Sequence, residues 1–343
     1  LKLAELENIS DAEMVRQQQM AMTNPDASNP SVEALLHAII PFAWIDHTHA
    51  DAVVTLTNTP AGNELMRKIY GERLLLIPYV MPGFKLSRKV LEITKNVDWT
   101  QFEGMILLNH GIFTFGNTAR ESYGRMIDLV SLAENYLEKH STLANTVAPD
   151  SVPVEMEGNA EEETVAPDSV PGKEELFKLA RIRRNVSEIR GSAMLAQLNF
   201  STEARTFAKL TNLKEIATRG PITSDHLIRT KPVPAIIDPE NLEQSLDDFA
   251  AEYKAYFERH TNGQQKCLDS APRWAVWPGI GTLAFGTNLT ESGIVADIAE
   301  HTVKAIQQAE NLQGNGTSGT WTPVSEKHLF DAEYWELQQA KLK

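Results

Sequence analysis

The stretch that decides the fold is LLNHGIFTFGNTARES, residues 107–122, because a related stretch recurs much later in the chain. Residues 281–292 read GTLAFGTNLTES, and both stretches contain the pattern G-x-x-x-F-G-x-x-x-x-E-S. Each copy follows an apolar run typical of a buried strand and precedes a long segment with helical periodicity. Repetition of such a unit predicts that the two halves of the chain share one fold, of the α/β class.

The first half also contains the stretch IDHTHADAVV at residues 45–54. We expect residues 44–57 to form a strand, and side chains two positions apart on a strand lie on the same face. His47 and His49 would therefore project together, and the fold would bring His110 to them. Three imidazoles with an open fourth position are the layout of a catalytic zinc site. A buried imidazole without a partner is costly, which also favours a metal ligand.

The second half lacks these histidines in the alignment that the repeat suggests. The longer match places Ile280 opposite His110, and a shorter match between two Asp-His pairs places Ile228 opposite His49. We therefore expect one metal site in the chain, in its first half.

The chain divides into two domains and a linker on composition. We expect a metal-binding domain at residues 1–140 and a second half without metal ligands at 174–343. Residues 141–173 are rich in proline and glutamate and poor in large apolar residues, which predicts a flexible acidic linker. The linker contains TVAPDSVP twice, at 146–153 and 164–171, and a recent duplication without structural meaning explains this repeat most simply.

Glu33 is the candidate general base. It lies near the start of an amphipathic helix expected at residues 32–40, which leads directly into the histidine strand. A carboxylate beside a divalent metal can act as a fourth ligand or as a base. Three histidines and one glutamate suit reactions that make or break a bond next to a carbonyl, since the metal stabilises the charge that develops there.

Other polar residues have more ordinary interpretations. Asp46 and Asp51 could orient an imidazole, although a solvated acid fits them as well. Arg229 and Lys231 could meet an anionic substrate, but we favour surface salt bridges for both. A core or surface role is preferred for the remaining histidines, which are His37, His140, His226, His260, His301 and His328.

The composition excludes several classes of function. The 343 residues carry a formal net charge of -14, which argues against general nucleic-acid binding. Cys267 is the single cysteine, so no internal disulfide is expected and a reducing, cytoplasmic compartment fits. No apolar run approaches the ~18–20 residues that cross a bilayer, so no membrane insertion is expected. No G-x-G-x-x-G motif opens a βαβ unit, so we expect no NAD site. The chain begins at Leu1 inside a polar segment, and we expect further sequence upstream.

Three short motifs together resemble the class II aldolase/adducin family. They are PSVE at residues 30–33, HTHA at 47–50 and NHG at 109–111. The resemblance implies a three-layer α/β/α domain, followed here by a degenerate second aldolase-like half. It also implies a homo-oligomer, since enzymes of this family form tetramers.

The same resemblance assigns roles to individual residues. It implies that His47, His49 and His110 bind Zn²⁺ or another divalent metal and that Glu33 is the catalytic base. It also implies that Ser31 contacts the phosphate of a phosphorylated sugar.

Longer motifs resemble the aldolase part of bifunctional rhamnulose-1-phosphate aldolase/short-chain dehydrogenase proteins. They are EALLH at 33–37, YVMPGF at 79–84, RGPITSDHLIRTK at 219–231 and FDAEYWEL at 330–337. This resemblance implies zinc-dependent cleavage of a ketose 1-phosphate, rhamnulose 1-phosphate above all, to dihydroxyacetone phosphate and an aldehyde. The alternatives are a pentulose-phosphate 4-epimerase and an adducin-like interaction module without chemistry. The module is expected to lose the metal histidines, whereas this chain has all three.

Overall fold

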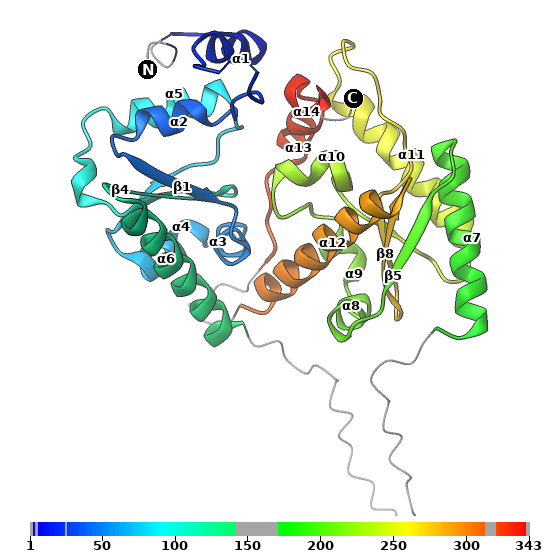
Figure 1. Cartoon of the computed structure of the whole chain (residues 1–343). Helices are drawn as coiled ribbons and strands as arrows, with labels where there is room; N and C mark the ends of the chain where they lie inside the picture. The colour runs from blue at the N-terminus through cyan, green and yellow to red at the C-terminus, as the bar shows by residue number, and fades with distance from the viewer. Residues whose placement is uncertain (1–2, 4–5, 25, 142–170, 313–319, 341–343) are drawn as a thin grey trace, which may run out of the picture.

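The described chain contains two four-stranded sheets with the same order and direction of strands (Figure 1). The first sheet has the order β1-β4-β3-β2, and the second has the order β5-β8-β7-β6. In each sheet the first two pairs are antiparallel and the last pair is parallel. The strands are β1 (Trp44–Thr48), β2 (Leu74–Ile77), β3 (Gly104–Leu107), β4 (Gly111–Gly116), β5 (Leu195–Asn199), β6 (Ala235–Ile236), β7 (Trp274–Trp277) and β8 (Gly281–Gly286). The computed structural model describes all residues except 1–2, 4–5, 25, 142–170, 313–319 and 341–343.

Helices cover both faces of the first sheet and make a three-layer domain (Figure 1). On one face, Leu36 and Val90 of two helices pack with Phe113 of the sheet in one buried cluster. On the other face, Met66 and Leu129 pack with Ile112. The helices of this part are α1 (Asp11–Met20), α2 (Ala34–Ile39), α3 (Asp51–Thr57), α4 (Gly62–Tyr70), α5 (Phe84–Thr94), α6 (Ala119–His140) and the 3₁₀ turn η1 (Trp99–Gln101).

The second sheet is also covered on both faces. Ile182 and Leu246 pack with Phe285 on one face, and Phe207 and Val303 pack on the other. The three-layer α/β/α architecture expected for the first half is therefore present twice. The helices of this part are α7 (Lys173–Arg190), α8 (Thr202–Ala208), α9 (Leu213–Ala217), the 3₁₀ turn η2 (Ser224–His226), α10 (Leu227–Thr230), α11 (Leu242–His260), α12 (Leu289–Glu310), α13 (Glu326–Glu333) and α14 (Glu336–Ala340).

The repeated sequence motif is the junction between the last strand and the long helix of each domain. In the first copy Thr118 caps α6 by accepting the Glu121 backbone N–H, and the Glu121 carboxylate accepts the Asn117 backbone N–H. This reciprocal cap satisfies amides that no helical carbonyl can reach. The hydroxyl of Ser122 donates to the Asp46 carboxylate, which joins the helix to β1.

The second copy uses the same contacts with different partners. Asn288 accepts the Glu291 backbone N–H, and the Glu291 carboxylate accepts the Thr287 backbone N–H. Ser292 accepts a hydrogen bond from the side chain of Gln197 on β5. In both domains the Glu of the motif caps the long helix, and the Ser joins this helix to the edge strand.

Strand register corrects one part of the expected alignment. His47 pairs with the third residue of β4, and Leu198 pairs with the third residue of β8. Leu198 therefore takes the place of His47, and Phe200, two residues later, takes the place of His49. The expected match of Ile228 with His49 is wrong, because Ile228 lies in α10, outside the sheet.

The other part of the alignment is confirmed. His110 directly precedes the glycine that begins β4, and Ile280 directly precedes the glycine that begins β8. The Asp-His pair at 225–226 lies in η2 and is unrelated to the pair at 46–47 in β1.

The expected strand at residues 44–57 is also corrected. β1 ends at Thr48, and Asp51–Thr57 form the helix α3. Residues 52–57 are all buried, because α3 packs against α6 and also against α12 of the second domain. A helix buried all round has no polar face, so its apolar run imitates that of a buried strand.

The two domains pack directly on each other. Val54 of α3 belongs to the core cluster that is otherwise built from the second domain. Asn58 is fully buried, donates from its side chain to the Ile222 carbonyl and accepts the Thr322 backbone N–H through its own carbonyl. The indole of Trp335 donates to the Asp11 carboxylate. The linker expected at 141–173 lies mostly outside the described residues.

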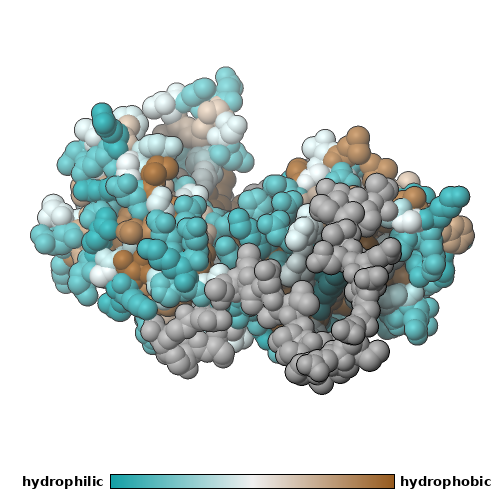
Figure 2. Space-filling model, turned by 90° about the horizontal axis from the view of Figure 1, so that it is seen from below, coloured by the Kyte–Doolittle hydropathy of each residue, from teal (hydrophilic) through white to brown (hydrophobic). Residues whose placement is uncertain are grey.

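The surface is mixed in polarity. Figure 2 shows hydrophilic residues over most of the visible face, with separate hydrophobic spots between them. Among the described residues, no helix is both long and apolar enough to cross a membrane.

Candidate metal centre

Four side chains from three separate segments converge at one end of the first sheet. Glu33 precedes α2, His47 and His49 lie at the end of β1, and His110 lies in the turn between β3 and β4. One ligand atom from each of them lies within 4.8 Å of all the others. Among the described residues this is the one group with such an arrangement. The four residues expected from the sequence to form the site are therefore brought together.

The His47 ring is held in a fixed orientation. Its Nδ1 lies 2.9 Å from the Ile112 carbonyl on the neighbouring strand, and its ring stacks on Phe113 at 3.9 Å between centroids. A carbonyl oxygen can only accept a hydrogen bond, so the neutral ring carries its proton on Nδ1. The Nε2 lone pair then faces the cluster, where it lies 3.0 Å from the Nε2 of His49.

His110 is presented by a backbone turn that the buried Asn58 supports. Asn109, the residue before it, has φ of 58°, in the left-handed region. Its side-chain amide donates to the Asn58 side-chain oxygen and to the Thr57 carbonyl, and its backbone N–H donates to the Thr57 hydroxyl. Asparagine tolerates the left-handed region better than most residues, because its side chain can hydrogen-bond locally. In the second domain Gly279 occupies the equivalent position with φ of 76°.

Glu33 is in contact with two of the histidines. One carboxylate oxygen lies 3.0 Å from the Nε2 of His110, and the other lies 3.4 Å from the Nε2 of His47. Burial would raise the pKa of Glu33, but the hydrogen bond from His110 and the charges of the histidines outweigh it and lower the pKa to about 2. Glu33 is therefore a carboxylate at neutral pH.

His47 and His49 favour the neutral form. Burial lowers the pKa of His47, and burial together with the charge of His110 lowers the pKa of His49 to about 4. Neutral imidazole is the form that binds a metal, because the metal needs the nitrogen lone pair.

The residues present fit a divalent metal ion. Two imidazole nitrogens face each other at 3.0 Å, although at most one of them can donate to the other. The Nδ1 of His110 is buried and has no hydrogen-bond partner among the described residues. A cation between His47, His49 and His110, with Glu33 beside it, would satisfy lone pairs that now converge on one another. The donor set of neutral imidazoles and a carboxylate suits zinc and related transition metals.

Two families of known sequence domains match the chain. "Class II Aldolase and Adducin N-terminal domain" matches residues 3–137, and "Aldolase class II, second domain" matches residues 174–342. The chain belongs to the class II aldolase/adducin family. The metal centre lies in the N-terminal class II aldolase domain, and the second class II aldolase domain has Leu198, Phe200 and Ile280 where the first has its histidines.

Individual relatives give less detail. The chain is 27% identical over 351 residues to "Uncharacterized oxidoreductase YuxG" from Bacillus subtilis (strain 168), and the match covers 99% of this chain. It covers 48% of that protein, so the chain spans about half the length of this relative. A solved structure, the N-terminal class II aldolase domain of a conserved protein from Thermoplasma acidophilum, is 38% identical with a TM-score of 0.36. That match covers 40% of this chain and 62% of the solved chain.

The second class II aldolase domain contributes a residue that the sequence did not reveal. The carboxylate of Asp225 lies 3.7 Å from the Nδ1 of His49 and is held by a hydrogen bond from the Gln338 side chain. Its negative charge favours a proton on that nitrogen, which leaves the other nitrogen of His49 for the cluster. No motif in the sequence signalled this contact, because 176 residues separate Asp225 from His49.

The remaining predicted residues have other partners. Ser31 is exposed, and its hydroxyl accepts the Glu33 backbone N–H, so it shapes the turn that carries the carboxylate. Its contact with phosphate stays a prediction. Asp46 accepts from Ser122, and Asp51 pairs with His301 of the second domain. Neither aspartate makes a hydrogen bond to a metal-site histidine within the described structure.

The expected surface role of Lys231 is wrong. Lys231 is 3% exposed, donates to the Asp269 carbonyl and places its ammonium 3.3 Å above the centroid of the Tyr253 ring. Burial and the nearby Arg273 lower the pKa of Lys231 to about 7. His37 matches its expected core role, since it packs edge-on against Phe113.

Substitution of Asn109 separates backbone strain from side-chain support. Asn109→Gly keeps the left-handed backbone without strain but removes the side-chain hydrogen bonds to Asn58 and to the Thr57 carbonyl, and we expect a loss of about 1 kcal/mol of unfolding free energy for each lost bond. Asn109→Ala removes the same bonds and adds about 1–2 kcal/mol of left-handed strain. Urea unfolding should therefore rank the variants wild type, Asn109→Gly, Asn109→Ala. Equal stability of the two variants would contradict the role of the positive φ.

Proposed function

We propose that this chain is a metal-dependent aldolase that cleaves a ketose 1-phosphate, with rhamnulose 1-phosphate as the substrate. The products are dihydroxyacetone phosphate and an aldehyde. The observation that carries the proposal is the Glu33 carboxylate inside the histidine cluster, 3.0 Å from His110. A carboxylate there can reach a carbon next to a carbonyl whose oxygens occupy the open side of the cluster.

His47, His49 and His110 would hold the metal, which is Zn²⁺ in this proposal, and Glu33 would lie beside it. The ion would supply Lewis acidity for the negative charge that develops on the substrate oxygens when the carbon–carbon bond breaks. The hydrogen bond from His47 to the Ile112 carbonyl keeps this ring in the tautomer that such binding requires.

Glu33 has the proton-transfer role. Cleavage of the C3–C4 bond requires loss of the proton on the C4 hydroxyl and later gain of a proton at C3. The carboxylate is largely buried and ionised, so it can hold a proton and deliver it to C3 away from bulk water. In the condensation direction the same carboxylate removes that proton.

The family resemblance assigns to Ser31 the contact with the phosphate of the substrate. This residue is exposed beside Glu33, so a substrate could reach it without a change of fold. The match covers 48% of the relative in Bacillus subtilis, and the activity proposed here concerns only the part that the two chains share.

A coupled assay for dihydroxyacetone phosphate tests the reaction. The purified chain, supplied with zinc, should release this product from rhamnulose 1-phosphate. Interconversion of pentulose 5-phosphates without release of dihydroxyacetone phosphate would instead identify an epimerase. No turnover of either substrate class by a fully metallated chain would favour an interaction module.

Replacement of Glu33 by Gln tests its role as the base. We expect kcat to fall by about 10²–10⁴-fold, because an amide cannot accept the proton, while metal content stays near the wild-type value. The matched control is Glu64→Gln on the exposed side of α4, which should keep full activity. A variant that loses its metal would show that Glu33 is a required ligand, and unchanged kcat would contradict the proposed base.

A further inference from the structure

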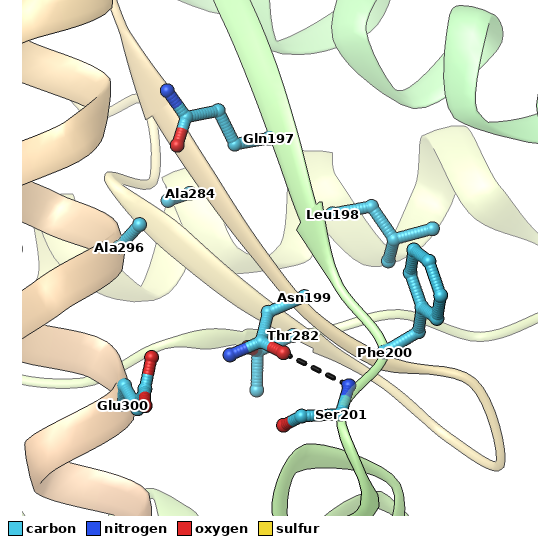
Figure 3. Close-up of a pocket in the computed structure, with 9 residues that line it drawn as sticks. All are labelled: Gln197, Leu198, Asn199, Phe200, Ser201, Thr282, Ala284, Ala296 and Glu300. Atoms are coloured by element: carbon cyan, nitrogen blue, oxygen red, sulfur yellow. Dashed lines mark hydrogen bonds between the residues drawn. The ribbon is translucent and has the colours of Figure 1, made fainter. Parts of the chain in front are cut away.

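A cavity lies in the second domain, between the second sheet and α12. It has a volume of about 330 Å³, at the lower end of the range of small-molecule sites. Figure 3 shows its lining side chains, which come from β5, β8, α12 and the start of α8. No histidine of the metal cluster lines it.

Strand alternation decides which side chains face the cavity. Gln197 and Asn199 on β5 point toward α12, whereas Leu198 and Phe200 point to the opposite face (Figure 3). Thr282 of the adjacent strand lies beside Asn199 in the same view. The floor of the cavity is therefore polar, although it lies on a sheet.

The same space in the first domain is filled by larger apolar side chains. β4 and β8 have the same length, as do α6 and α12, so positions correspond directly. Buried Ile112 corresponds to Thr282, and buried Met126 corresponds to Ala296. The first-domain residues belong to the core cluster of their domain.

The exchange of large apolar residues for small or polar ones opens the cavity. Removal of buried methylene groups costs stability in proportion to the space left behind. At the cavity edge, the partly buried Val130 of the first domain corresponds to Glu300, which is exposed. This space is polar and has a carboxylate at its edge, so a polar ligand suits it better than apolar side chains would.

The lining leaves several hydrogen-bonding groups available. The Asn199 side-chain oxygen accepts the Ser201 backbone N–H, which leaves its amide hydrogens. Gln197 donates to Ser292, which leaves its side-chain oxygen. Thr282 is 4% exposed, and its side chain also lines the cavity. The cavity thus offers both hydrogen-bond donors and acceptors.

The charge of the lining decides the class of ligand. Among its described lining residues there is no lysine, arginine or histidine, and Glu300 is the one charged group. Glu300 forms no ion pair with any described residue. A phosphate would meet the like charge of Glu300 with no cation among the described lining residues, which is unfavourable. We propose that this cavity binds a small uncharged polyhydroxy compound, a monosaccharide or a sugar alcohol, as a second ligand site distinct from the metal centre.

Ligand-observed NMR and calorimetry on the full chain can test the proposal. The probes are erythritol, xylitol and fructose, with fructose 1-phosphate as the charged comparison. At least one neutral probe should bind, and fructose 1-phosphate should bind more weakly at this site. Because fructose 1-phosphate is also a candidate ligand of the metal centre, binding is compared with and without the cavity-filling variant described next.

Two variants that restore first-domain residues fill the cavity. Ala296→Met and Thr282→Ile should each weaken neutral-probe binding by at least tenfold and leave the metal content unchanged. The matched control is Lys304→Met, which puts the same methionine at an exposed position of α12 outside the cavity and should keep wild-type binding. Thr282→Ile also provides a check against a folding defect, because an apolar side chain at this buried position suits the core.

Three outcomes would overturn the proposal. The first is that no neutral probe binds to the wild-type chain. The second is that Ala296→Met binds the neutral probes as tightly as the wild type does. The third is that Ala296→Met abolishes the binding of fructose 1-phosphate as well as the binding of fructose. None of these results depends on aldolase activity. The proposed function can therefore fail while this site stands, and the reverse also holds.

Discussion

His110→Ala is expected to abolish both metal binding and aldolase activity. Metal analysis of the wild-type chain should find about one divalent ion per chain, as a site with three protein ligands requires. His110 is 4% exposed and contacts Glu33, so its removal deletes a ligand and also frees the buried carboxylate. The loss of affinity should exceed the ~10–100-fold that follows loss of a hydrogen-bond partner of a ligand.

A histidine outside the cluster provides the control. His140→Ala removes a ring that stacks on Tyr136 at the end of α6, far along the chain from the ligands, and should retain metal and activity. Chelation of the wild-type metal should reproduce the activity loss of His110→Ala, and added Zn²⁺ should restore activity only to the wild type. Full metal content in His110→Ala, with native circular dichroism, would refute the assignment of this site.

The sequence predicts the fold class and the four clustered residues, because the signals for them are local. The repeated glycines, capping glutamate and serine are local signals, because each acts within a few residues of the strand–helix junction. The pair His47 and His49 is also local, since both follow from one short strand end. The third histidine, His110, follows an apolar run that predicts a buried strand, and its Asn-His-Gly turn also resembles the family motif.

Long-range packing explains the errors. Helix α3 was expected to continue β1, because its burial by α12 of the second domain removed any helical periodicity. The two Asp-His pairs looked like a repeat until the strand register showed that residue 225 lies in another element. The contact of Asp225 with His49 depends on how the two domains pack, and no local pattern encodes that packing. The buried position of Lys231 was missed for the same reason.

Gly111→Ala is expected to weaken metal binding by displacing two ligands at once. A Cβ atom at Gly111 would lie 2.6 Å from the Thr48 carbonyl oxygen, 2.9 Å from the Cδ2 of His49 and 3.1 Å from the Cε1 of His47. Atoms at such distances must move, and the carbonyl belongs to the backbone of the paired strand. The shift should cost about 1–3 kcal/mol of unfolding free energy, as for other overpacked sites. Because both rings move, metal affinity should also fall by at least tenfold, measured by competition with a chelating dye.

The second domain offers a matched control for this prediction. A Cβ atom at Gly281 would lie 2.1 Å from the Asn199 carbonyl oxygen, so Gly281→Ala produces the same clash between paired strands without a histidine nearby. It should lower stability and leave metal affinity unchanged. Gly124→Ala on α6 meets nothing within 4 Å and should raise stability by about 0.5–1 kcal/mol through helix propensity. Loss of metal in Gly281→Ala would mean that general destabilisation, and not displacement of His47 and His49, accounts for the effect at Gly111. Loss confined to Gly111→Ala would instead show that the close approach of β1 and β4 sets the ligand geometry, because Gly281→Ala has the closer clash and adds strain from a φ of 151° at Gly281.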